Sequence, residues 1–324
     1  MKVIPQSFEP IHTSPTDHIA NIAAAARICY KSEGKATANE TSFVRGLVKG
    51  GHNSTLEMSI LHLRLVLHNK EDQSALFESK FLEPITFGNS TYCTGSIRAW
   101  REFIISRRSY KKLTDSILLY MSKHLSEVFT EDLMKYEVIS TNNLYYIDQF
   151  DPEKLDGMCT SEMGIVSKQH IYQGIKFTTN RAVSHEFVRH RPCAFLQESQ
   201  RYCAYSKGKF GGEVTFIEPT AFYDVDTQGY SIWYNACANA EDNYLNLLKG
   251  GDSAQAARNV LPNSCKTELI IYCSLAQWEH IFAMRDSTKA DPAMREAIEP
   301  VVEWFSKEWL GSIDPNQMWN KSIG

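Results

Sequence analysis

Several signals that assign a chain to a common class are missing from this 324-residue sequence. Its eight cysteines form no Cys-x-x-Cys pair and no zinc-like spacing, so we interpret them as reduced thiols and expect no metal site. Neither Gly-x-Gly-x-x-Gly nor a Walker sequence occurs, so the chain has neither the Rossmann nor the P-loop nucleotide-binding motif. No apolar run approaches the ~20 residues that cross a bilayer, and the N-terminus does not resemble a signal peptide. We therefore expect a cytoplasmic protein with no membrane partner.

An excess of positive charge is also missing. Lysine and arginine number 34 against 38 aspartates and glutamates, for a net charge of -4, and the pI is about 6.2. Because general nucleic-acid binding needs a broad positive field, we expect no nucleic-acid partner. With 43% hydrophobic residues the chain can build a substantial core, as one large domain or two small ones. No internal repeat or low-complexity tract stands out.

Cationic residues are nevertheless concentrated in one segment, Arg189-His190-Arg191, directly before Pro192. The residue before a proline is pushed out of the α region, so the helix expected over 182–190 should end here. Cations at a helix C-terminus complement the helix dipole by roughly 0.3–1 kcal/mol each, and one would suffice for that purpose. The density of cations favours an anion site.

The residues after the proline extend this pattern. Gln197, Ser199 and Arg201 occupy alternate positions, so an extended backbone places their amide, hydroxyl and guanidinium groups on one side. Such a strip of donors suits a phosphate. Elsewhere, the strand pattern is clearest over 60–68, where leucines alternate. Helices are expected over 15–31, 41–49, 113–129, 182–190, 229–249, 252–261, 267–285 and 292–310.

The cationic segment resembles a family signature. Arg189-His190-Arg191, then seven residues, Ser199 and the following Arg201-Tyr202 match the motif of the flavin-dependent thymidylate synthases, and 180–188 looks like the helix that leads into it. Three further stretches resemble elements of the same family in the same order. They are Gly51–Glu57 (G-H-x-S-x-x-E), Ala257–Pro262 (A-R-x-x-L-P) and His280–Arg285, a late helix ending in arginine.

The resemblance implies roles for individual residues. The positions matched to flavin contacts are His52, Ser54, Arg189, His190, Arg191, Gln197 and His280. The positions matched to the surroundings of dUMP are Glu186, Gln197, Ser199, Arg201, Arg258 and Arg285. Arg285 is the catalytic candidate, because a guanidinium at the N3/O4 edge of uracil in a dry pocket stabilises the negative charge that makes C5 nucleophilic. On one continuous helix Ser274, Ile281 and Arg285 would share a face.

The resemblance also implies the fold and the reaction. We expect an α+β fold with a mixed or antiparallel sheet surrounded by helices, like that of thymidylate synthase complementing proteins. We expect a single domain over 1–324, with an insertion at about 70–170. FAD reduced by NADPH and a one-carbon unit from methylenetetrahydrofolate would convert dUMP to dTMP, in a homotetramer with shared active sites.

Two alternatives of other classes remain open: a catalytically silent relative that binds flavin or nucleotide, and a nucleic-acid-binding protein that uses the Arg/His cluster. Ser274 and Ala276 stand where the family commonly has asparagine and arginine directed at the flavin of a neighbouring subunit. Cys193 follows a proline, as does the nucleophile of the unrelated folate-dependent synthases. The residues around it match the flavin family, which uses no enzymic cysteine, so we expect Cys193 to be dispensable.

Within the insertion, Thr94–Phe103 resembles a G-N-x-R-x-x-R-E element of longer relatives, with Ser96 in place of asparagine. A series of cations begins in this element. We interpret the series as a solvated helix face, with a substrate-facing cluster as the alternative. Its members are Arg98, Arg101, Arg107, Arg108, Lys111 and Lys112.

Overall fold

The computed structural model describes residues 1–29, 39–137, 144–155, 167–200 and 212–309. The chain divides into two compact units. Unit 1 comprises Met1–Ile11, Ile28–Ser32 and Gly174–Gly324, and unit 2 comprises His12–Arg27 and Glu33–Gln173. Both units combine helices with antiparallel strand pairs, so the expected α+β class is confirmed. A single functional domain with an insertion stays a prediction.

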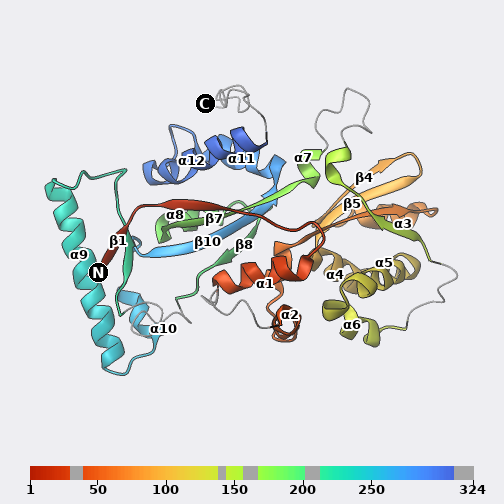
Figure 1. Ribbon diagram of the computed structural model, residues 1–324, viewed down its shortest axis with the longest axis horizontal. Coiled ribbons are helices and arrows are strands. Elements are labelled where there is room, and N and C mark those ends of the chain that lie inside the picture. The colour runs from red at the N-terminus through yellow and green to blue at the C-terminus, as the bar shows by residue number, and fades with distance from the viewer. Residues whose placement is uncertain (30–38, 138–143, 156–166, 201–211, 310–324) are drawn as a thin grey trace. The chain divides into compact units, whose positions relative to one another are not determined.

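Unit 2 contains a four-stranded sheet in the order β4-β5-β3-β6, and every neighbouring pair in it is antiparallel. Figure 1 labels β4 and β5 of this sheet. Its strands are β3 (Ile60–Val66), β4 (Leu82–Phe87), β5 (Ser90–Ser96) and β6 (Tyr146–Gln149). The alternation predicted over 60–68 is present in β3, where Leu61, Leu63 and Leu65 are buried. They join one hydrophobic cluster with residues of the surrounding helices.

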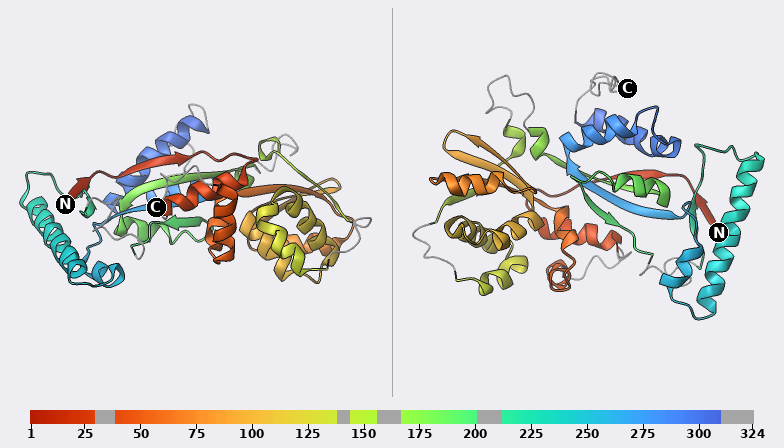
Figure 2. Two further views of the ribbon diagram at one scale, coloured as in Figure 1. Left: turned by 60° about the horizontal axis from the view of Figure 1, so that its bottom comes forward. Right: turned by 180° about the vertical axis from the view of Figure 1, so that it is seen from behind.

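Helices supply the rest of unit 2. They are α1 (His18–Cys29, of which His18–Arg27 belong to this unit), α2 (Glu40–Lys49), α3 (Lys70–Phe77), α4 (Ile97–Ser106), α5 (Lys111–His124), α6 (Ser126–Lys135) and α7 (Ser167–His170), with short 3-10 turns η2 (Asn53–Met58) and η4 (Pro152–Lys154). Figure 2 shows α4, α5 and α6 gathered beside the sheet.

Unit 1 contains a second four-stranded sheet, in the order β2-β7-β10-β8. Its strands are β2 (Ser7–Ile11), β7 (Tyr172–Asn180, of which Gly174–Asn180 belong to this unit), β8 (Ala194–Gln197) and β10 (Lys266–Ser274). A parallel pair is formed by β1 (Lys2–Ile4) and β9 (Thr215–Ile217). The helices are α8 (Arg181–Phe187), α9 (Gln228–Lys249), α10 (Ala254–Ala257), α11 (Leu275–Arg285) and α12 (Pro292–Glu308), with the 3-10 turn η7 (Arg258–Val260). No helix of the described residues is long and apolar enough to cross a membrane.

The helix predicted over 267–285 is wrong in its first half. Lys266–Ser274 forms strand β10, and the helix α11 begins only at Leu275. Leu269 to Cys273 are all buried, because β10 lies between two neighbours in the sheet and has lost the alternating pattern of a half-exposed strand. Ser274 is the N-cap of α11 and accepts a hydrogen bond from Gln277 N–H. It therefore does not share a helical face with Ile281 and Arg285.

Two other predicted helices also differ from the structure. The helix expected over 182–190 ends at Phe187, and Val188 and Arg189 continue as a turn. The helix expected over 113–129 is two helices, α5 and α6, separated by Leu125.

A series of six elements occurs in the same order in both units, a partial repeat that the sequence analysis missed. In each, a central strand is followed by a helix, two further strands and two helices: β3-α3-β4-β5-α4-α5 in unit 2 and β7-α8-β8-β10-α11-α12 in unit 1, where β9, α9 and α10 are inserted. Three strands hold corresponding places in the sheets, since β4-β5-β3 matches β8-β10-β7. The fourth strands differ, because β6 follows β3 in the chain whereas β2 precedes β7.

Local details support this correspondence at β5-α4 and β10-α11. Ser96 and Ser274 each end a strand and cap the next helix through the N–H three residues on. Four residues after each serine stands a tryptophan without exposed surface, Trp100 or Trp278. Eleven residues after each serine stands an arginine, Arg107 or Arg285, where the helix ends.

Candidate functional site

Arg285 is the centre of a polar cluster in unit 1. Its guanidinium Nη1 donates to the Glu186 carboxylate (2.6 Å to Oε2), and Nη2 donates to the Glu186 carbonyl oxygen at 3.0 Å. Its Nε donates to Nε2 of His190 at 2.9 Å. The Arg285 side chain is only 14% exposed, so these charge-assisted contacts lie in a low-dielectric environment and fix the plane of the guanidinium.

The contact with Arg285 defines the proton distribution on His190. An arginine Nε–H can only donate, so Nε2 of His190 must be the acceptor and any proton of the neutral ring sits on Nδ1. Burial, together with the nearby Arg285 guanidinium and His280 imidazole, lowers the pKa of His190 to about 4. The His280 ring meets it edge to face, with 5.9 Å between centroids. His190 is therefore neutral near pH 7.

The backbone around α8 explains why Glu186 and His190 meet the same arginine. Asn180 caps the helix by accepting from Val183 N–H, and Phe187 anchors its last turn in the core, with its ring 4.6 Å from that of Phe177. The chain then turns, and His190 N–H donates to the Phe187 carbonyl. This short α8 with its closing turn brings Glu186 and His190 to the end of α11.

Gln197 is held at the end of β8. Its Nε2 donates to the hydroxyls of Ser184 (2.9 Å) and Thr267 (3.2 Å). The next residue, Glu198, pairs with Lys266 at 2.8 Å. The alternation was predicted over Gln197, Ser199 and Arg201, but the strand ends at Gln197, the first of the three. Ser199 follows the strand and is half-buried, and Arg201 lies outside the described residues, so a common face for the three stays a prediction.

The other two arginines of the signature differ from Arg285. Arg189 and Arg191 are exposed, and among the described residues neither has a carboxylate partner. Arg258, in η7, is half-buried and likewise forms no ion pair within the described part of the chain. Unneutralised guanidinium groups are what an anionic ligand requires, so these residues fit the phosphates of a nucleotide or of FAD.

His52 and Ser54 belong to unit 2, where both side chains are exposed at the start of η2. Contacts within this unit join the two family-like elements that the sequence places far apart. Arg98 of α4 pairs with Glu57 at 2.6 Å, and Arg101 donates to Asn53 at 3.3 Å. The sequence analysis matched both elements to the family but missed their contact.

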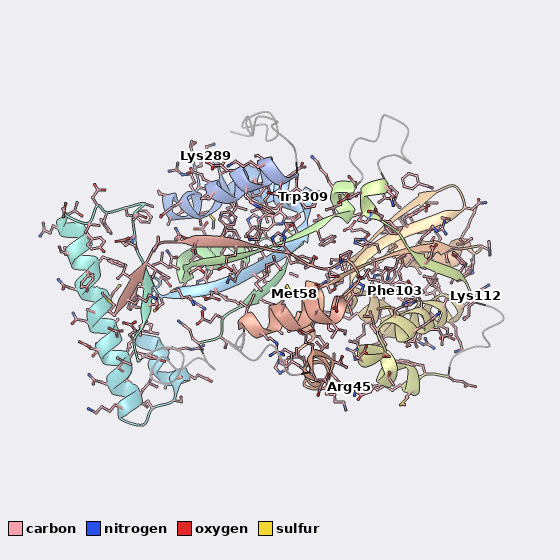
Figure 3. All side chains as sticks on the ribbon, in the orientation of Figure 1. Arg45, Met58, Phe103, Lys112, Lys289 and Trp309 are labelled. Carbon is pink, nitrogen blue, oxygen red and sulfur yellow. The ribbon has the colours of Figure 1, made fainter. Side chains whose placement is uncertain are left out.

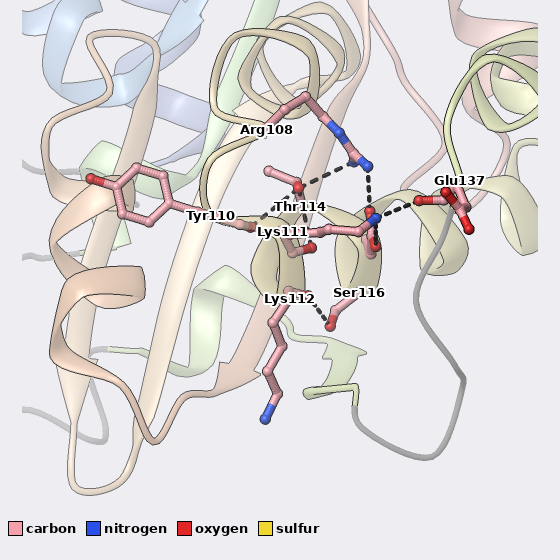
Figure 4. Close-up of polar contacts among 8 residues, drawn as sticks. Arg108, Tyr110, Lys111, Lys112, Thr114, Ser116 and Glu137 are labelled. Atoms are coloured by element: carbon pink, nitrogen blue, oxygen red, sulfur yellow. Dashed lines mark hydrogen bonds and ion pairs between the residues drawn. The ribbon is translucent and has the colours of Figure 1, made fainter.

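The cation series from Arg98 to Lys112 is largely neutralised by carboxylates. Arg98 also pairs with Glu102 at 2.6 Å, and Arg108 and Lys111 both bind the buried Asp115, at 2.6 and 2.9 Å. Figure 4 shows Arg108 and Lys111 converging at the start of α5, where Lys111 also donates to the Glu137 carbonyl. This pairing supports the structural interpretation of the series. Among the described residues no group of His, Cys, Asp or Glu could hold a metal ion.

Residues 168–309 match the model of a family described as thymidylate synthase complementing protein. The resemblance inferred from the motifs is therefore confirmed for this part of the chain, which includes Glu186, His190 and Arg285.

Individual relatives carry a more specific name. The chain is 28% identical over 138 residues to a flavin-dependent thymidylate synthase of Pyrococcus abyssi, a match that covers 39% of this chain and 55% of the relative. It is 32% identical over 132 residues to one of Corynebacterium glutamicum (36% and 50%), and 32% identical over 120 residues to one of Geobacter sulfurreducens (36% and 48%). The chain thus spans about half the length of the curated relatives that it matches.

Proposed function

We propose that this protein is a flavin-dependent thymidylate synthase, a methyltransferase that converts dUMP to dTMP with FAD as cofactor and NADPH and methylenetetrahydrofolate as co-substrates. The observation that carries the proposal is the cluster in which Glu186 and His190 hold Arg285, inside the region that matches the family. The fold of that family, a cytoplasmic location and a homotetramer with shared active sites belong to the same proposal.

The surroundings of Arg285 support the catalytic role proposed for it. Electron density at C5 of uracil rises when negative charge on the N3/O4 edge is stabilised, and a fixed guanidinium does this best where water is excluded. Arg285 meets both conditions, since it is 14% exposed and three hydrogen bonds fix its plane. A neutral His190 adds no competing positive charge near pH 7.

The remaining residues bind and orient. Arg189, Arg191 and Arg258, which lack carboxylate partners among the described residues, would hold phosphates, with Ser199 and Arg201 beside the nucleotide. Gln197, His280, His52 and Ser54 would contact the flavin. FAD, when bound, supplies the reducing equivalents of the reaction. In this structure the Glu186 carboxylate accepts a hydrogen bond from the Arg285 guanidinium. The uracil of dUMP would therefore have to bind that guanidinium together with the carboxylate or displace the carboxylate from it.

The test is the complete reaction, with dUMP, methylenetetrahydrofolate, NADPH and FAD, performed on the wild type, Arg285→Ala and a matched control. Lys289→Ala is the control because it removes an exposed cation close in sequence to α11. We expect dTMP from the wild type and the control, and at least a 100-fold lower rate from Arg285→Ala, on the scale of losing one charge-stabilising donor. The flavin absorbance of Arg285→Ala should be retained.

Two results would count against the proposal. Turnover retained by Arg285→Ala would remove the role assigned to that residue. A wild type that binds flavin but shows no dUMP-dependent oxidation of the reduced cofactor would favour the silent-relative alternative.

A further inference from the structure

Two cysteines of unit 1 face each other across neighbouring strands. Strands β8 and β10 are antiparallel, and the last pair at one end of their ladder is Ala194 opposite Tyr272. Cys193 directly precedes β8, so the same register places it opposite Cys273, the next residue of β10. Both thiols are free, and a side-chain hydrogen bond joins them.

The register also determines how close the two cysteines lie. Glu198 N–H donates to the carbonyl oxygen of Glu268 opposite, which marks these two residues as a hydrogen-bonded pair. Hydrogen-bonded and non-hydrogen-bonded pairs alternate along an antiparallel ladder, and Cys193 is five positions from Glu198, so it forms a non-hydrogen-bonded pair with Cys273. The Cα atoms of such a pair are about 4.5 Å apart, inside the range of roughly 4.4–6.8 Å that a disulfide requires.

Both cysteine side chains lie on the same side of the sheet. Phe195 and Ile271, each two residues from a cysteine along its strand, pack in the same hydrophobic cluster as the two cysteines. Trp309, labelled in Figure 3, packs against this cluster as well. Cys273 has no exposed surface, whereas Cys193 is half-buried. Of the two thiols, Cys193 is therefore the one that a small solute reaches first.

We propose that Cys193 and Cys273 are a redox site, at which a peroxide converts the two thiols to a reversible disulfide. The Cys193 sulfur attacks one oxygen of hydrogen peroxide, the O–O bond breaks, and the departing hydroxide takes the thiol proton and leaves as water. The Cys273 sulfur then attacks the sulfur of the resulting sulfenic acid. The S–S bond forms, the S–O bond breaks, and a second water leaves with the Cys273 proton. Both sulfurs are oxidised, and the peroxide is reduced to two waters.

The surroundings of each thiol assign the order of the two steps. Burial raises the pKa of Cys273 well above its usual value, and the hydrogen bond with Cys193 raises it further. Cys273 is thus kept protonated and away from solvent, so it reacts only with a group already in contact with it, which is the role of the second thiol.

Two other cysteines of unit 1 provide a contrast. Cys237 and Cys265 are 1% and 0% exposed, and burial raises their pKa values to about 11 and about 12. Neither thiol can meet a peroxide or form the thiolate that would attack it, so we expect both to stay reduced.

The disulfide would connect the candidate site to the strand that leads into α11. His190 and Arg191 lie just before Cys193, and Ser274, the N-cap of α11, directly follows Cys273. Oxidation should therefore restrain the turn that carries His190. Neither sulfur takes part in the chemistry proposed for the site, so this proposal does not depend on the proposed function.

The experiment treats the reduced full chain with a small excess of hydrogen peroxide. The proteins are the wild type, Cys193→Ala, Cys273→Ala and the matched control Cys237→Ala, which removes another buried cysteine of the same unit. Free thiols are blocked with iodoacetamide, and peptide mapping without reductant identifies linked cysteines. Dimedone labels sulfenic acid, hydrogen exchange reports on the His190 amide, and near-UV circular dichroism shows whether each variant is folded.

We expect a peptide that links Cys193 to Cys273 in the wild type and in Cys237→Ala, and we expect dithiothreitol to remove it. Both single variants of the pair should lack the linked peptide, and Cys273→Ala should accumulate a dimedone label at Cys193. Exchange of the His190 amide should slow roughly 10-fold in the oxidised wild type.

Three results would count against the proposal. A folded wild type without the linked peptide, or with Cys193 linked to a different cysteine, would overturn it. An unchanged exchange rate at His190 in the oxidised protein would refute the restraint on the turn. Because peptide mapping does not require dTMP formation, a failure here is distinguishable from a failure of the proposed function.

Discussion

Acidification should destabilise unit 1, because the folded protein holds His190 in its neutral form. Its pKa is lowered from 6.5 to about 4 in the folded protein, because the ring is buried beside Arg285 and His280. The folded state therefore holds the neutral ring, while the unfolded chain takes up a proton below pH 6.5. The contribution of His190 to the unfolding free energy is therefore fully present above pH 6.5 and is lost as pH falls from 6.5 to about 4.

The magnitude follows from the two pKa values. Between pH 7 and pH 5, a single histidine with this shift costs about 2 kcal/mol of unfolding free energy. The physical cause is specific, since a protonated His190 loses the lone pair that accepts from Arg285 Nε and places two cations 2.9 Å apart. In the folded protein the contact should persist at pH 5 and break only as pH falls through about 4.

The measurement must report on unit 1 alone, because burial lowers the pKa of His62 and His170 in unit 2 to about 4 as well. Hydrogen exchange of the β10 amides, corrected for the intrinsic pH dependence, provides this. We compare the wild type with His190→Gln, whose amide oxygen accepts a hydrogen bond but does not titrate. His185→Gln, which changes an exposed histidine of α8, is the matched control.

We expect the wild type and His185→Gln to lose about 2 kcal/mol more protection from pH 7 to pH 5 than His190→Gln does. If all three proteins lose the same protection, His190 is not the group that titrates, and the assignment of its neutral form to the contact with Arg285 is refuted.

Two further predictions concern residues outside the Arg285 contacts. Cys193→Ala should leave the rate of dTMP formation within about twofold of the wild type, because the proposed chemistry uses no thiol; loss of turnover with an unchanged circular dichroism spectrum would contradict this. Ser96→Ala and Ser274→Ala each remove one N-cap bond and should each lower the unfolding free energy of their own unit by about 1 kcal/mol, measured by hydrogen exchange. A cost confined to one of them would show that the two caps are not equivalent.

Local patterns made some of the fold predictable. The leucines of β3 alternate because one face of that strand is buried, and the period of two survives in the sequence. Because both faces of β10 are buried, its sequence lacks that alternation. Its apolar residues run directly into those of α11, and the two elements were therefore predicted as one helix. Ser274, with its capping bond to Gln277 N–H, marks the true boundary and was the clue available in the sequence.

The sequence motifs predicted which residues belong to the candidate site, but they did not predict which of those residues contact one another. The motifs named Glu186, His190 and Arg285, but Arg285 and His190 are 95 positions apart, and their contact depends on where α8 stops. The repeat escaped detection because its signal is a few separated residues, such as Trp100 and Trp278, at matching distances from a serine. Equivalent burial of those residues becomes visible only when the strands and helices are in place.

The corresponding arrangements in units 1 and 2 have an evolutionary consequence. Because both arrangements belong to one polypeptide, every molecule contains one of each, and a substitution in one is always present beside the other. The arrangement around Arg107 has Glu102 at the position that corresponds to His280, and it has an arginine and a capping serine at the other two corresponding positions. The substitution Glu102→His would therefore test whether the two arrangements are structurally equivalent, by asking whether unit 2 then gains a histidine–arginine contact of its own.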